Sequence, residues 1–140
     1  MKYFLLLLAF VGNVACAQGV ANLQIVPLAS AAQTAATVNS AAQINYTFRG
    51  AHFVVNVSAF TAGTYTPHIQ AQDPVSLAWY DLLVGPAIGA TGTTVLKVYP
   101  GIGVVANGAA ADMLPQTWRV QLIGAGGQSM TISVAAYMGL

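Results

Sequence analysis

The sequence carries very little charge. Only four basic and three acidic residues occur among its 140 residues, and glutamate is absent. Typical globular domains are about a quarter charged. Nucleic-acid binding needs clustered Lys and Arg to neutralise phosphates, and the basic residues here are spread along the chain. The sequence therefore predicts no nucleic-acid partner, and it disfavours a highly charged small-molecule ligand.

Cysteine and histidine are also scarce. The single cysteine, Cys16, excludes an intramolecular disulfide. A metal site needs about three or four suitable ligands, and only Asp73 and Asp81 could join the two histidines, His52 and His68. We therefore interpret the histidines as ordinary residues on strand faces, and we predict neither a metal nor a cofactor.

No catalytic arrangement is evident in the sequence. The only acids are Asp73, Asp81 and Asp112, and each lies near an expected turn or strand end. Neither histidine has an evident acid to orient it, as a nucleophile–base pair would require. Too few titratable groups are present for a tuned active site. We expect a protein that is not an enzyme.

Apolar and small polar residues take the place of charge. The chain is 56% hydrophobic and 5% charged, so its surface must consist largely of Ala, Gly, Ser, Thr, Asn and Gln. Such a surface has little electrostatic protection against association, and it is tolerated best when other subunits cover it. We therefore expect a homo-oligomer that also contacts other structural subunits.

The N-terminus has the form of a secretory signal peptide. Lys2 precedes an apolar run, and Ala15-Cys16-Ala17 predicts cleavage between Ala17 and Gln18. Two alternatives stay open: a lipoprotein-like site that would acylate Cys16, and an uncleaved anchoring or packing segment. Any membrane contact is expected only through residues 3–17.

The strongest fold signal is the stretch from Ala51 to Gln72. It contains two runs of alternating apolar and polar residues joined by Thr61-Ala62-Gly63, a pattern typical of a β-hairpin. The second run places five uncharged or weakly basic polar side chains on one face, which we interpret as a candidate contact surface. These residues are Thr64, Thr66, His68, Gln70 and Gln72.

Further strands are expected along the rest of the chain. Their alternation and turn signals predict strands over residues 23–28 (at a sheet edge or a strand end because of Pro27), 44–48, 75–83, 93–99, 118–123 and 129–137. A helical turn is expected over residues 109–113, and a hairpin loop over 124–128.

The whole pattern predicts an all-β chain. We expect a single antiparallel β-sandwich of about seven or eight strands, of jelly-roll or immunoglobulin-like topology. Residues 1–17 form the apolar segment, residues 18–43 an arm with a short strand, and residues 44–140 the sandwich. Within the arm, residues 30–42 are expected to be an extended arm or loop that could lie across a neighbouring subunit.

Two adjacent aromatic residues, Trp79 and Tyr80, could form a sugar-stacking platform if they are exposed. Alternation instead favours Trp79 on the inward face with Val75 and Leu77. Trp118 is predicted to lie in the core for the same reason.

The chain from residue 46 to 123 resembles a group of small β-rich structural proteins of tailed bacteriophages and prophages. The resemblance is carried by Arg49-Gly50-Ala51-His52, by the segments TPHIQAQD and WYDLLVGPAIGATGTTVLKVYPGIG, and by LPQTWRVQL. It implies a minor capsid, decoration or fibre-like virion component that works by oligomeric packing.

The sequence therefore leads to one main functional hypothesis and two alternatives. The main hypothesis is a non-enzymatic structural subunit located in a phage-like virion. The leader favours an exported bacterial surface or extracellular filament subunit, because a phage protein assembled in the cytoplasm needs no leader. A carbohydrate-binding module that uses Trp79 or Tyr80 is the third possibility.

Overall fold

The structure, a computed structural model, describes residues 22–140. The predicted leader and the cleavage site between Ala17 and Gln18 lie outside the described residues. Within residues 22–140 the chain is all-β, as predicted, with eight strands in one mixed sheet and no helix. Consequently no helix of this part of the chain could cross a membrane. The strands are β1 (Asn22–Gln33), β2 (Thr37–Asn39), β3 (Gln43–Ile44), β4 (Gly50–Gln72), β5 (Trp79–Val84), β6 (Gly92–Val98), β7 (Ala109–Ala110) and β8 (Thr117–Gly139).

Strands β4 and β8 pair with each other over almost their whole length. The antiparallel register runs from Gly50 opposite Gly139 to Ala71 opposite Trp118. The predicted β-hairpin within residues 51–72 is therefore wrong. Its two runs are the halves of one strand of 23 residues, and each half pairs with the matching half of β8.

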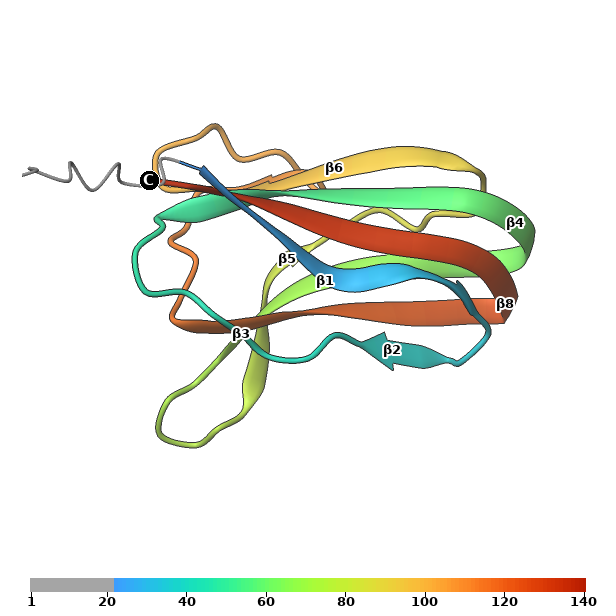
Figure 1. Cartoon of the computed structure of the whole chain (residues 1–140), viewed down its shortest axis with the longest axis horizontal. Helices are drawn as coiled ribbons and strands as arrows, with labels where there is room; N and C mark the ends of the chain where they lie inside the picture. The colour runs from blue at the N-terminus through green and yellow to red at the C-terminus, as the bar shows by residue number, and fades with distance from the viewer. Residues whose placement is uncertain (1–21) are drawn as a thin grey trace, which may run out of the picture.

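Both long strands bend at the same end of the molecule, so the sheet folds back on itself (Figure 1). The predicted hairpin loop over residues 124–128 lies inside β8 at this bend. Gly63, Gly126 and Gly127 have φ values of 71°, 75° and 65°, which L side chains rarely adopt. A Cβ atom on Gly63 would lie 2.5 Å from the Cα of Gln128. The two backbones therefore bend together, in close contact, where the sequence predicts two chain reversals.

The two halves of the folded sheet enclose one core. Phe53 from the first half of β4 packs edge-on against Trp118 at the start of β8, with ring centroids 5.4 Å apart. Most residues that alternation predicts to face inward are buried. They are Phe53, Val55, Val57, Tyr65, Ile69, Ala71, Leu96, Val98, Trp118, Val120, Leu122, Met130, Ile132, Val134 and Ala136. Ala59 is one exception and is exposed, because the register shifts between Val57 and Ala59.

Strands β1, β2 and β3 together line the outer edge of β8. Strand β1 pairs with the second half of β8, while β2 and β3 pair with the first half. Pro27 lies at a register shift in β1, on a sheet edge as predicted. Residues 30–42, predicted as an arm or loop, instead complete β1 and form β2. The Tyr65 hydroxyl donates to the Ala35 carbonyl at 2.7 Å, and burial raises the pKa of Tyr65.

The opposite edge is formed by β5, β6 and β7. Strand β6 agrees with its prediction, since Leu96 and Val98 are buried and Lys97 is exposed. The helical turn predicted over residues 109–113 is wrong. Residues 109–110 instead form β7, which pairs in parallel with β6, and the Lys97 N–H donates to the Gly108 carbonyl at 2.9 Å.

The loop between β4 and β5 projects from the body of the sheet (Figure 1). The Asp73 carboxylate accepts the backbone N–H groups of Val75 and Ser76, at 2.8 and 3.4 Å, and these bonds lower the pKa of Asp73. The turn therefore extends to Ala78, and the strand starts at Trp79. Val75 and Leu77, predicted to face inward, are 90% and 62% exposed.

The strand predicted over residues 44–48 ends early, at Ile44. Asn45 is buried, and its side-chain amide donates to the carbonyls of Phe48 and Leu114 at 2.8 and 2.7 Å. Its Oδ1 accepts the N–H of Phe48 at 2.9 Å. These local bonds satisfy the backbone in a turn, so the alternation of Ile44, Tyr46 and Phe48 does not continue the strand.

The replacement Gly63→Ala is expected to lower the free energy of unfolding by about 1–3 kcal/mol, because it strains the backbone at the bend. Chemical denaturation measures this loss. Gly103→Ala is the matched control, since a Cβ atom there meets no heavy atom within 4 Å. Equal losses in the two variants would contradict the close crossing of β4 and β8.

Candidate functional site

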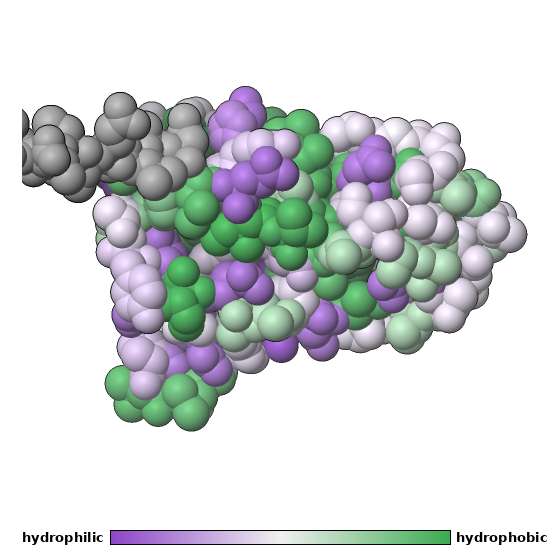
Figure 2. Space-filling view, in the orientation of Figure 1, coloured by the Kyte–Doolittle hydropathy of each residue, from purple (hydrophilic) through white to green (hydrophobic). Residues whose placement is uncertain are grey.

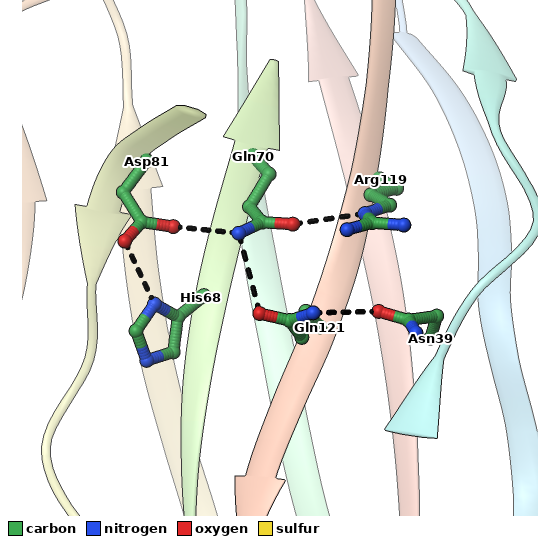
Figure 3. A network of polar contacts seen from close by, with 6 residues as sticks. All are labelled: Asn39, His68, Gln70, Asp81, Arg119 and Gln121. Carbon is green, nitrogen blue, oxygen red and sulfur yellow. Dashed lines mark hydrogen bonds and ion pairs between the residues drawn. The ribbon is translucent and has the colours of Figure 1, made fainter. Parts of the chain in front are cut away.

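A network of hydrogen-bonded polar side chains crosses the outer face of the sheet on β5, β4, β8 and β2 (Figure 3). Gln70 lies at its centre. The Gln70 amide donates to Asp81 Oδ1 at 2.9 Å and to Gln121 Oε1 at 3.3 Å. Its Oε1 accepts from Arg119 Nε at 2.8 Å. One neutral amide therefore links an acid and a base from two different strands.

The network continues at both ends. Gln121 donates to Asn39 Oδ1 on β2 at 2.9 Å. His68 Nδ1 lies 3.0 Å from Asp81 Oδ2 on β5, so the neutral ring can donate through this nitrogen. The prediction that neither histidine has an orienting acid is wrong for His68. Asp81 lies 13 residues away in sequence, and only the pairing of β4 with β5 brings the two together.

Arg119 also stacks on an aromatic ring. Its guanidinium carbon lies 4.3 Å from the centroid of the Trp79 ring, a distance typical of a cation–π contact. Burial lowers the pKa of Arg119, but a guanidinium keeps its charge at neutral pH. Trp79 therefore belongs to the polar network, and the prediction that it lies in the core is wrong. Its neighbour Tyr80 is 47% exposed.

The predicted contact face is on the outer side of β4, but it is more covered than the sequence suggests. Gln70 is buried, and the other four residues of the face are half-buried. The Gln72 amide donates to the Leu77 carbonyl at 3.0 Å. Neighbouring strands therefore already use part of the hydrogen-bonding capacity of this face. The sequence did not assign three residues to this face. They come from strands that pair with β4, and no local pattern indicates that they lie here: Asp81, Arg119 and Gln121.

The arrangement orients polar groups and offers no nucleophile. In residues 22–140, His68 has no hydrogen bond to a hydroxyl or thiol group, which nucleophilic catalysis would require. The same part of the chain contains no cluster of three or more metal-ligating residues. His52 and His68 lie in different halves of β4, where they pair with Tyr137 and Gln121 of β8.

Comparison with models of protein families, with curated proteins and with solved structures found no match.

The replacement Gln70→Ala is expected to lower the free energy of unfolding by about 1–3 kcal/mol, because Arg119 and Asp81 lose their shared partner in a largely covered site. Thermal or chemical unfolding measures this effect. Gln24→Ala is the control, since Gln24 is exposed on β1 and its side chain makes no hydrogen bond within residues 22–140. A loss no larger than that of the control would show that the network adds nothing to stability.

Proposed function

We propose that this chain is a non-enzymatic structural subunit of a phage-like virion, such as a capsid decoration, minor capsid or fibre-like protein. It works by packing against copies of itself and against other structural subunits. The resemblance of residues 46–123 to phage structural proteins supports the class of protein. The main observation behind the proposal is that one edge of the sheet contains no charged residue.

This edge consists of β1, β2 and β3. Residues 22–44 contain no Asp, Glu, Lys, Arg or His. Strand β1 has twelve residues and pairs with β8 on one side only. The opposite edge of the sheet contains Asp81 on β5 and Lys97 on β6. Soluble proteins commonly guard sheet edges with charged side chains, because open backbone groups otherwise pair with another chain. Within residues 22–140, the edge formed by β1–β3 therefore lacks the charged side chains that the opposite edge has.

Apolar side chains are exposed on the same edge. Leu23, Val26 and Ile44 are 42%, 55% and 48% exposed. Figure 2 shows apolar residues gathered over β1 and at the tip of the loop between β4 and β5. Exposed apolar groups beside an open edge are typical of a surface that a partner covers.

The fold that accompanies this proposal is a β-sandwich whose layers are the two halves of the folded sheet. Its support is the single core in which side chains from both halves of β4 and β8 meet. We propose that the strands of this sandwich follow either a jelly-roll or an immunoglobulin-like topology.

The double replacement Ser30→Lys and Ala32→Lys is expected to weaken self-association at least about tenfold, because like charges on two paired edges repel each other. Both residues are exposed on β1, so the fold tolerates the change. Sedimentation velocity over a series of concentrations measures the association.

The double replacement Ala90→Lys and Thr91→Lys is the control for that experiment. It adds the same two charges at exposed positions just before β6, at the opposite edge. It should leave association unchanged. A wild-type chain that stays monomeric at its highest soluble concentration, or equal effects of the two changes, would overturn the proposal.

The second candidate function is an exported bacterial surface or filament subunit. Ala15-Cys16-Ala17 favours this candidate, since a cleaved leader makes Gln18 the mature N-terminus. The intact mass of the native protein is then expected to equal that of a chain beginning at Gln18. A mass that includes Met1 would exclude the cleaved form, and electron microscopy of the same material separates particles from filaments.

A further inference from the structure

A hollow of about 360 Å³ lies beside the projecting loop between β4 and β5. Three separate segments line it: the end of β4 with the loop, Tyr80 on β5, and residues 115–117 before and at the start of β8. Sites for small ligands usually measure about 300 Å³ or more. The hollow is therefore large enough to receive a small ligand or one part of a longer one.

The aromatic ring in the hollow is available. Tyr80 is 47% exposed, and in residues 22–140 its ring stacks on no other aromatic ring or cation. Trp79, by contrast, is covered by Arg119. An exposed tyrosine offers an apolar ring face and a hydroxyl that donates and accepts hydrogen bonds.

Both walls of the hollow are held in place by hydrogen bonds. On one side, Gln72 Nε2 donates to the Leu77 carbonyl at 3.0 Å. On the other side, the Gln116 carbonyl accepts the N–H of Asn45 at 2.7 Å, and Thr117 pairs with Ile44. Pro74 and Pro115 add two fixed φ angles to the lining. The site is preformed, which lowers the entropic cost of binding.

The lining contains no charged residue. Its polar groups are the amides of Gln72 and Gln116 and the hydroxyls of Tyr80 and Thr117. The side chains of Gln116 and Thr117 make no hydrogen bond within residues 22–140, so they can turn to a ligand. A ring for stacking, surrounded by neutral amides and hydroxyls, matches the alternating C–H faces and hydroxyls of an uncharged pyranose.

We propose that the hollow at Tyr80 binds a neutral oligosaccharide. One sugar ring stacks on the Tyr80 side chain, while Gln116 and Thr117 hydrogen-bond its hydroxyls. This binding activity goes beyond the structural role. The hollow is lined by the loop, β5 and the start of β8, and it adjoins the β3 end of the uncharged edge, because Thr117 pairs with Ile44. The test must therefore separate sugar binding from self-association.

A second hollow, of about 190 Å³, lies beside Tyr99 and Tyr137. It is smaller, and the Tyr99 hydroxyl already donates to the Leu140 carbonyl. It also includes His52, which can carry charge. These differences favour the Tyr80 hollow, and they provide an internal control for it.

The test uses the full chain and three neutral probes: maltohexaose, cellohexaose and hexa-N-acetylchitohexaose. Saturation-transfer difference NMR detects the contact, and titration gives the affinity. At least one probe is expected to bind with a Kd of about 1 mM or below. The Tyr80→Ala variant should weaken this binding at least about tenfold, and Tyr80→Phe should keep most of it. Gln116→Ala on the other wall is expected to weaken it as well.

Tyr137→Ala is the matched control, because Tyr137 is 48% exposed and Tyr80 is 47% exposed. It should leave binding unchanged, and thermal unfolding verifies that each variant is folded. Three results would overturn the proposal. These are the absence of binding to all three probes, equal effects of Tyr80→Ala and Tyr137→Ala, and a Tyr80→Ala variant that loses self-association instead of sugar binding. The last result would assign the hollow to a contact between copies.

Discussion

The pairing of β4 with β8 is the constraint on which the rest of the structure depends. Each strand has 23 residues, while strands in globular proteins usually have about five or six. A flat ribbon of that length would leave its apolar face in water, so it must bend to bury that face. Gly63 permits the bend because it has no Cβ atom. A Cβ atom at this position would lie only 2.5 Å from the Cα of Gln128. Strands β1, β2 and β3 then pair with β8 on one side of this folded ribbon, β5 and β6 pair with β4 on the other side, and β7 pairs with β6.

The sequence predicts the faces of the strands much better than it predicts their partners. Alternation is a local property, so Phe53, Tyr65 and Val134 are correctly expected inside. Pairing is not local. The connector at Gly63 has the composition of a turn, and both a reversal and a bend need a glycine with positive φ. The signal that could have distinguished them is that residues 51–72 and 118–137 both contain two alternating runs around a glycine, which suits them to pair along their full length.

Side chains that bond to the backbone explain two further failures in the fold. Asp73 and Asn45 each satisfy nearby N–H groups, and in both places the chain leaves the sheet although apolar residues still alternate. The candidate site could be predicted only in part, because some of its residues come together through strand pairing. The polar face of β4 follows from alternation, but Asp81 and Arg119 join it only through strand pairing. Tyr80 is exposed, and the hollow forms beside it, because the chain turns at Asp73. The alternation of apolar residues gave no indication of this turn.

The uneven distribution of charge between the two sheet edges bears on the kind of assembly. If two copies pair through the same β1 edge, the contact is isologous and closes at two subunits. A filament needs a second, different surface, because only a head-to-tail contact repeats without closing. The connection between β6 and β8 offers one, since Val104, Val105 and Met113 are 74%, 59% and 61% exposed there. A virion subunit can use both surfaces, one toward its copy and one toward the particle. A filament would instead pair the uncharged β1 edge of one copy with this second surface on the next copy, because an open edge leaves backbone groups and apolar side chains in water.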